Sequence, residues 1–328
     1  MDEHGTTAAQ RSLVDRADGW QRRRRWVAFP VAVVRKYAED GAARNAARVA
    51  YYAFFSIFPL LLVFVSLLGF ALEGDPALRR DILDSAFADM PVVGPFVRND
   101  VGAIGGSGVA LAVGIAVALW AGLGVTTALG QAFDDVWSVP RLREPGFVSR
   151  RLRGLVTLAV AGVGIVASSA LGGAATSGRL GAAGESAAVL VLSLAVDALA
   201  LMAAFRLLTA HSPGVRELVP GVVVATLGLL VLQALGGWYV SVTIERASDT
   251  YGFFATVIGL LSWLSLTAQL LLVAAEVNAV RVLRLWPRSL RGVTTPADER
   301  ALERYAERAR RDPGERIAVR WTRPGRRR

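Results

Sequence analysis

Six long apolar runs constrain the fold of this chain more than any other feature of its sequence. They cover approximately residues 46–72, 109–133, 154–173, 187–209, 218–243 and 253–282. About 20 apolar residues in an α-helix cross the ~30 Å hydrocarbon core of a bilayer, so each run is long enough to span a membrane. We therefore predict an all-α, polytopic membrane protein whose six-helix transmembrane bundle occupies residues 46–283.

The composition agrees with a membrane domain. Of the 328 residues, 53% are hydrophobic, and the mean hydropathy is +0.43, which is more apolar than a soluble domain. The chain has no cysteine, which excludes disulfides, thiolate metal sites and a cysteine nucleophile. Its two histidines, His4 and His211, are far apart in the sequence, so we expect no clustered metal motif and no cofactor.

The distribution of lysine and arginine predicts the topology. Residues 1–45 contain nine such residues, the 134–153 connection five, the 206–217 connection two and the tail from Arg281 fifteen, whereas the three opposite connections contain five in total. By the positive-inside rule, both termini are expected in the cytoplasm, and the number of spans is expected to be even. The net charge of +10 is therefore interpreted as a sign of membrane topology, and no nucleic-acid partner is expected.

The N-terminal segment, residues 1–45, is basic and contains one short apolar stretch. That stretch, Trp26 to Val34, contains Pro30 and is too short to cross a bilayer. Arginines flank it on both sides, which is typical of an interfacial helix on an anionic leaflet. It lacks the small-residue cleavage pattern of a signal peptide, so we expect this segment to be retained.

Two further segments outside the spans have helical patterns. In the basic tail, residues 284–328, Thr295 can cap one helix near 296–311, and the tail's arginines are expected to contact anionic headgroups. The acidic connection at 73–107 alternates apolar and charged residues, which predicts an amphipathic helix on the outer side. Membrane lipids are thus the expected partners of these flanking segments.

Small residues recur every four positions in the second and third runs. The ridges are Gly114, Ala118, Gly122, Thr126 and Gly130, and then Gly164, Ser168 and Gly172. Such ridges let membrane helices approach closely, where lipid supplies no hydrophobic drive for association. They indicate either packing within the bundle or the face of a homodimer, and the sequence leaves both open.

Polar and helix-bending residues within the spans form a candidate polar pathway. The set is Tyr51, Tyr52, Ser56, Pro59, Asp197, Gln233, Gln269, Glu276 and Asn278. Asp197 lies midway along the fourth run, where a carboxylate costs ~3 kcal/mol even on insertion scales, so it should face the bundle interior or water. Pro59 should kink the first span, and Glu276 shares nearly one helix face with Gln269.

An alternative role for the two acids is structural. Asp197 and Glu276 could belong to a pathway, or each could lock helices together as part of a buried pair. A second group, Asp134, Asp135 and Trp137, ends the second span at the expected cytoplasmic interface, where acids are tolerated and Trp is favoured. Arg206 is expected to snorkel to the same interface.

Several stretches in the right order resemble the YihY/BrkB family of bacterial inner-membrane proteins. They are AYYAFFSIFP at 50–59, FDDVWSV at 133–139, VPG at 219–221, YGFF at 251–254 and AEVNA at 275–279. The resemblance covers roughly residues 35–285. The chain departs from the family at Asp134 and Asp135, where a Leu-Asn type pair is common, so a shared role for this acidic pair is not implied.

The resemblance implies a six-span protein of the inner membrane, connected with envelope integrity and with lipid or lipopolysaccharide export. We therefore expect a transporter or translocator of a lipid or other amphiphile. A non-transporting membrane organiser that recruits envelope proteins or anionic lipids is the alternative. Some relatives carry a ribonuclease label, but this sequence has neither a clustered metal motif nor an RNA-binding module, so we expect no such enzyme.

Overall fold

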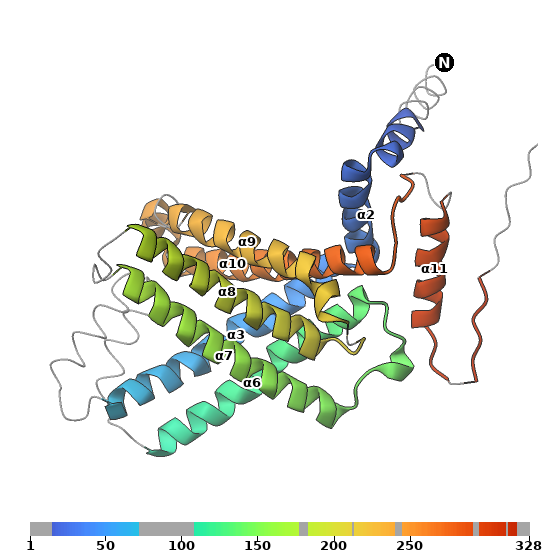
Figure 1. The fold of residues 1–328 in the computed structure, drawn as a ribbon. Coiled ribbons are helices and arrows are strands. Elements are labelled where there is room, and N and C mark those ends of the chain that lie inside the picture. Colours follow the sequence, from blue (N-terminus) through green and yellow to red (C-terminus); the bar gives the residue numbers. More distant parts are fainter. Residues whose placement is uncertain are drawn as a thin grey trace, which may run out of the picture.

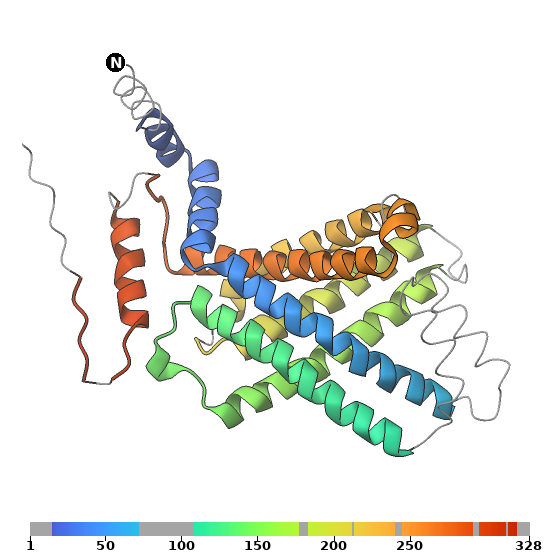
Figure 2. The same ribbon diagram turned by 180° about the vertical axis from the view of Figure 1, so that it is seen from behind.

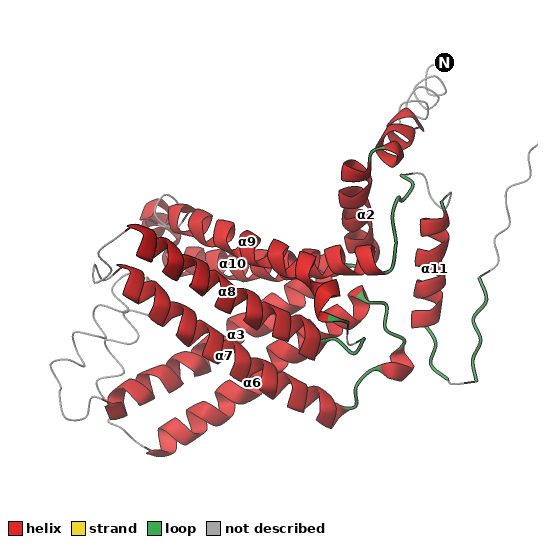
Figure 3. Ribbon diagram, in the orientation of Figure 1, coloured by secondary structure: helices red, strands yellow, loops and turns green. Residues whose placement is uncertain are grey.

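The computed structural model describes residues 15–71, 108–176, 183–211, 213–239, 245–290, 295–312 and 314–319. Within these ranges the regular structure is entirely helical (Figure 3). Six helices are long and apolar enough to cross a membrane, which confirms the prediction of an all-α protein with six spans. The amphipathic helix predicted at 73–107 lies outside the described residues.

The bundle consists of six helices of 25 to 38 residues. They are α3 (Ala42–Ala71), α6 (Gly108–Val136), α7 (Phe147–Thr176), α8 (Ala183–Leu208), α9 (Val215–Tyr239) and α10 (Glu245–Val282). The helix α3 continues without interruption through Pro59. Large apolar side chains such as Val163, Ile165 and Val166 are exposed on the bundle, as expected for surfaces that contact lipid tails.

The bundle helices pack in chain order around a closed circle. Each helix packs against the next, and α10 returns to pack against α3 (Figures 1 and 2). In addition, α6 contacts α8 and α10, so it lies closer to the centre than a simple ring would place it. The packing of α6 against α3 is more extensive than its packing against α7.

Small residues make the close helix contacts. A side chain at Gly114 would meet Leu62 and Val63 of α3, and one at Gly122 would meet Leu158 of α7. The ridge of α7 faces α8, where the Ser168 and Ser193 hydroxyls are hydrogen-bonded at 2.7 Å. The described residues of both predicted ridges therefore pack within the bundle.

The helices α2 (Arg25–Glu39) and α11 (Pro296–Arg308) lie at one end of the bundle, which we call the terminal end (Figure 1). The predicted short helix at Trp26–Val34 lies within α2, which crosses the end of α10 at a steep angle (Figure 2). Gly41, with a positive φ of 63°, turns the chain from α2 into α3. The short helix η2 (Arg141–Arg143) lies in the connection from α6 to α7.

The expected cap of the tail helix is confirmed. The Thr295 hydroxyl accepts a hydrogen bond from the backbone N–H of Asp298, and the Asp298 carboxylate accepts one from the Thr295 N–H, which completes a capping box. The helix runs Pro296–Arg308, slightly shorter than the predicted 296–311. Its first turn is thus fixed by its own sequence.

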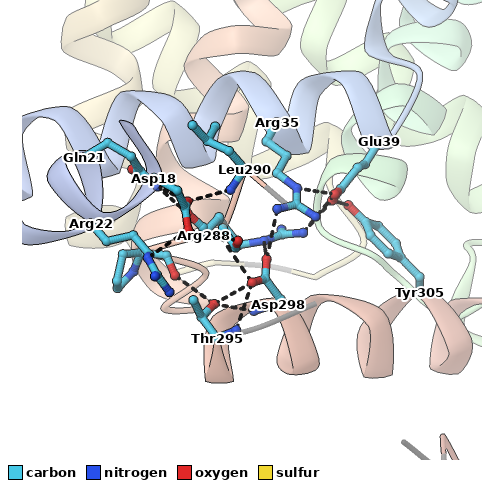
Figure 4. A network of polar contacts seen from close by, with 12 residues as sticks. Asp18, Gln21, Arg22, Arg35, Glu39, Arg288, Leu290, Thr295, Asp298 and Tyr305 are labelled. Atoms are coloured by element: carbon cyan, nitrogen blue, oxygen red, sulfur yellow. Dashed lines mark hydrogen bonds and ion pairs between the residues drawn. The ribbon is translucent and has the colours of Figure 1, made fainter. Parts of the chain in front are cut away.

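A polar network joins the two ends of the chain at the terminal end (Figure 4). The guanidinium of Arg288, which is 1% exposed, donates to Asp298 at 2.6 Å and to both carboxylate oxygens of Glu39 at 2.9 Å. Gln21 donates to the Arg288 carbonyl at 2.7 Å, and the Leu290 N–H donates to Asp18 at 2.8 Å. We call this assembly of residues 15–40, 285–290 and α11 the terminal module.

Candidate functional site

A groove of about 300 Å³ opens on the side of the bundle, between α3, α6 and α7. Its lining residues are Arg48, Tyr52, Trp120, Ala121, Gly124, Thr127, Ala128, Gln131 and Arg151. Trp120 is 71% exposed and Tyr52 41% exposed, so the groove faces the surroundings of the bundle. We call it the lateral groove.

The groove exists because α6 has only small residues at three of its lining positions. A Cβ at Gly124 would lie 3.0 Å from the Tyr52 ring, so the absence of a side chain leaves room between α6 and α3. The neighbouring Ala121 and Ala128 are also small. Any larger side chain at Gly124 would therefore displace Tyr52 or fill the groove.

The groove runs along α6 from polar to apolar surroundings. Gln131 lies five residues before Val136 at the terminal end of α6, and Trp120 lies sixteen residues before it. At ~1.5 Å per residue these positions are about 8 and 24 Å from that end. The polar lining is thus near the terminal end, and the apolar lining reaches beyond the middle of a ~30 Å hydrocarbon layer.

Two arginines supply the charge of the groove. Arg48 lies in the second turn of α3, and its Nη2 donates to the Ala128 carbonyl at 3.3 Å. Arg151 lies in the second turn of α7, with its guanidinium carbon 5.2 Å from the centre of the Phe147 ring. No aspartate or glutamate is among the lining residues. The groove is therefore cationic.

Where the terminal module meets the bundle, Lys36 and Asp40 of the module and Glu276 of α10 form a buried cluster. Lys36 is the only lysine of the chain, and both it and Glu276 are fully buried. The Lys36 ammonium lies 2.5 Å from an Asp40 oxygen and 3.1 Å from a Glu276 oxygen. One ammonium therefore serves two buried carboxylates.

The same lysine also closes the end of a third helix. Its Nζ donates to the carbonyl of Val136 at 2.6 Å, and Val136 is the last residue of α6, where helices leave carbonyls without intrahelical donors. A cation there is favoured by the helix dipole as well. Lys36 thus joins α2, α6 and α10 at one point.

The carboxylates near this cluster affect the pKa of two tyrosines of the terminal module. Burial raises the pKa of Tyr37, and the nearby Glu276 carboxylate raises it further. Burial also raises the pKa of Tyr305 of α11, with added contributions from the Asp40 and Glu39 carboxylates. Both phenols therefore stay neutral beside the carboxylates.

Asn278 acts two residues beyond Glu276 at the crossing of α9 and α10. Its Oδ1 accepts a hydrogen bond of 2.7 Å from the Gly221 N–H. A Cβ at Gly221 would lie 2.2 Å from the Ala274 carbonyl oxygen, so the two helices can approach this closely only at glycine. The VPG and AEVNA stretches thus meet in the structure.

The other residues of the predicted polar pathway do not gather around Glu276 among the described residues. Gln233 is exposed on α9, and Gln269 is half-buried and donates to Ser265 one turn earlier. Asp197 is half-buried on α8, between Ser193 and Ala200, which contact α7. None of these three lines the lateral groove.

Of the candidate residues in α3, only Tyr52 lines the groove. Tyr51 is 57% exposed, with its ring centre 4.8 Å from that of Phe55. Ser56 is buried and donates to the Ala53 carbonyl at 2.7 Å. Pro59 is half-buried farther along the helix. The first span therefore contributes one predicted residue to the groove.

The acidic end of α6 binds protein rather than facing outward. Asp134 is 4% exposed and accepts a hydrogen bond of 2.8 Å from the Ala210 N–H. Asp135 accepts from Asn45 at 3.0 Å and pairs with Arg308 of α11. Trp137, 3% exposed, stacks on His211. These residues thus fasten α6 to its neighbours, whereas Arg206 is exposed on α8.

Four residues of the groove and of the buried cluster were not among those predicted from the sequence. They are Arg48, Arg151, Lys36 and Asp40. Arg48 had a recognisable signal, because it lies inside the first predicted span rather than in a flanking segment. Lys36 was visible as the single lysine among 37 basic residues, with Asp40 one helical turn later. Nothing in the sequence paired either residue with α6 or α10.

Comparison with known proteins places the chain in a family. The family model described as "Virulence factor BrkB" matches residues 33–290. A relative in Bacillus subtilis (strain 168), named as the ribonuclease-like protein YfkH, is 26% identical over 257 residues, covering 75% of this chain and 92% of the relative.

A second relative and the solved structures complete the comparison. A protein of Alkalilimnicola ehrlichii named as a UPF0761 membrane protein is 29% identical over 266 residues. The match covers 76% of this chain but 57% of that protein. No solved structure matches. With the family model matched over most of its length and six spanning helices in its fold, this chain is an integral membrane protein that belongs to the BrkB virulence-factor family.

Proposed function

We propose that this protein translocates a lipid or another amphiphile in maintenance of the bacterial envelope. The lateral groove is the observation that supports the proposal. It opens on the lateral surface of a membrane-spanning bundle, and it carries polar residues near one end and apolar residues toward the middle of the span. An amphiphile has the same order of groups, so its headgroup can enter the groove while its chains stay in lipid.

Lipid flip-flop in liposomes tests this function. The purified protein is reconstituted, and the fraction of fluorescent lipid that a membrane-impermeant quencher reaches is followed over time. Gly124→Leu should slow flip-flop, because the new side chain fills the groove beside Tyr52. Gly162→Leu is the matched control, since nothing lies within 4 Å of a Cβ at that position. A folded Gly124→Leu protein with wild-type flip-flop would exclude the groove as the path.

A non-transporting membrane organiser is the second candidate function. The surface of the terminal end supports it, because several arginines there are exposed. They include Arg23, Arg24, Arg25, Arg141 and Arg143. Two results together would favour this function. Liposomes that contain the wild-type protein would show no lipid flip-flop, and the wild-type protein would capture an envelope partner that is lost when Arg23, Arg24 and Arg25 become glutamine.

We also propose that the terminal end lies in the cytoplasm and the bundle in the inner membrane. The excess of lysine and arginine in the terminal segments supports this orientation. The absence of cysteine makes a single introduced thiol unambiguous. In intact cells, an impermeant thiol reagent should label Ala187→Cys, at the far end of α8, and spare Arg141→Cys in η2. The reverse labelling would overturn the orientation.

Transport is proposed in preference to RNA hydrolysis. Within the described ranges, no three His, Asp or Glu side chains gather so as to hold a metal ion. The buried carboxylates of Glu276 and Asp134 are engaged with Lys36 and with the Ala210 N–H. Purified protein should therefore leave a labelled RNA intact with and without divalent cations. Cleavage that copurifies with the wild type and is lost in Glu276→Gln would contradict this.

A further inference from the structure

We infer that the lateral groove binds the phosphate of an anionic lipid headgroup through Arg48 and Arg151. This inference rests on the proposed function for the location of the groove in lipid, and it names the class of amphiphile that the groove accepts. Two guanidinium groups line one space with no carboxylate among the lining residues. The local charge is therefore left for a ligand to neutralise.

Arg48 carries the first part of the case. It lies inside a membrane span and is half-buried, and its Nε is buried without a hydrogen-bond partner among the described residues. The Ala128 carbonyl satisfies only one of its donors. Asp135, one turn beyond Gln131 on α6, is held by Asn45 and Arg308. A guanidinium at this depth is costly without an anion.

Arg151 differs from the two other arginines in the same turns of α7. Arg150 pairs with Glu144 at 3.2 Å, and Arg150 and Arg153 both line a separate small cavity that includes Asp134. Arg151 instead faces the lateral groove, and the Phe147 ring holds its guanidinium from one side. Among the described residues it has no ion pair, so its planar donors are available to a ligand.

The chemistry of the lining selects a phosphate with an attached chain. Guanidinium donors match phosphate oxygens in geometry and charge. The Gln131 amide can donate to an ester oxygen of a headgroup, and the Thr127 hydroxyl, which donates to the Leu123 carbonyl at 2.6 Å, can accept from a glycerol hydroxyl. Trp120 and Ala121 offer an apolar wall to the first carbons of a chain. With no carboxylate to pair an amine, a net anionic headgroup fits better than a zwitterionic one.

The size of the groove agrees with a headgroup rather than a whole lipid. About 300 Å³ is at the lower limit of ligand pockets, which is room for a glycerol-phosphate unit. The acyl chains would remain in the surrounding bilayer, past the exposed Trp120. A phosphatidylglycerol-like lipid meets these requirements.

Equilibrium binding to the full chain in neutral detergent tests the inference. The titrated probes are dihexanoylphosphatidylglycerol, dihexanoylphosphatidylcholine and glycerol 3-phosphate, followed by isothermal titration calorimetry. The phosphatidylglycerol should bind at least about tenfold more tightly than the other two. Each arginine-to-glutamine change should weaken its binding by about tenfold, the effect of one charge-assisted hydrogen bond.

Matched variants keep the test falsifiable. Arg48→Gln/Arg151→Gln is compared with Arg141→Gln/Arg143→Gln, which removes the same charge from exposed positions in η2 at the same end. If the double groove variant does not fold, Arg151→Gln alone suffices, because it gives up only the ring contact with Phe147. Equal binding of phosphatidylglycerol by the groove and control variants would overturn the inference.

Two further outcomes separate the sources of phosphate and the two proposals. Glycerol 3-phosphate bound as tightly as the lipid would show a soluble phosphate site and overturn the lipid assignment. Because binding is measured without transport, arginine-dependent lipid binding in a protein that does not flip lipids would support this inference and defeat the proposed function. Flip-flop that is equally fast for anionic and zwitterionic lipids would support the proposed function and defeat this inference.

Discussion

Lys36 and Glu276 meet 3.1 Å apart in a fully buried contact between α2 and α10. The contact brings together a residue of the N-terminal segment and the carboxylate that interrupts the last apolar run. Asp40 and the Val136 carbonyl complete the surroundings of the lysine. The ion pair of Glu276 with Lys36 therefore holds the terminal module on the bundle.

Lys36→Met should destabilise the protein strongly. It leaves the carboxylates of Asp40 and Glu276 buried beside each other without a cation, and breaking a buried pair by removing one partner costs about 3–5 kcal/mol. Glu276→Gln should cost less, because Lys36 keeps Asp40. Thermal unfolding in one detergent measures both variants. Equal melting temperatures for the two variants would show that the lysine does not serve both acids.

Gly221→Ala should destabilise the crossing of α9 and α10. The added Cβ would lie 2.2 Å from the Ala274 carbonyl oxygen and 2.3 Å from the Asn278 amide nitrogen, and such overpacking costs about 1–3 kcal/mol. Gly162→Ala, in open space on α7, should be neutral or slightly stabilising because alanine favours helix. The melting temperature should fall in Gly221→Ala and should not fall in Gly162→Ala. A stabilised Gly221→Ala would refute this close approach.

The number and type of the spans could be predicted because apolar length alone determines them. A run such as 187–209 has only one way to satisfy its backbone in lipid, and α8 follows it closely. The capping box at Thr295 was likewise visible, since its partners are three residues apart. Local rules of this kind need no knowledge of the neighbouring helices.

Contacts between distant residues could not be predicted in the same way. Glu276 and Asp197 looked alike as carboxylates in apolar runs, yet Glu276 pairs with Lys36, 240 positions earlier, while Asp197 lies half-buried on α8. The lateral groove depends on the absence of a side chain at Gly124 opposite Tyr52. Its arginines come from α3 and α7, and only the packing order of the helices brings them to one space.

Acidification should release the terminal module below about pH 4. Burial by itself raises the pKa of Asp298, but hydrogen bonds from Thr295, Arg288 and the Ser289 N–H outweigh it and hold the pKa below its ordinary value of 3.8. The ionised group thus stabilises the folded state above pH 3.8, and this contribution is lost as the pH falls through the lowered pKa.

A spin label at Glu303→Cys, on the exposed side of α11, can follow this release. Its mobility should be low at pH 5 and should rise toward pH 3. In an Asp298→Asn background the label should be mobile at both values, because the carboxylate that docks α11 is absent. A label with the same low mobility at pH 3 would show that this carboxylate does not control docking.

Arg288→Gln should detach α11 while leaving the bundle intact. The guanidinium holds Asp298 of α11 and Glu39 of α2 at once. Its loss removes the more deeply buried of the two described guanidinium groups that pair with both carboxylates, and leaves them to Arg35. The contacts among α3, α6 and α10 do not involve this residue. Hydrogen exchange at neutral pH should become at least about tenfold faster in the backbone N–H groups of α11 that follow Pro296, which corresponds to ~1.4 kcal/mol of lost protection. Arg316→Gln, an exposed position beyond α11, is the control and should exchange like the wild type. Exchange that accelerates throughout the spans of Arg288→Gln would instead show that the terminal module and the bundle unfold as one unit.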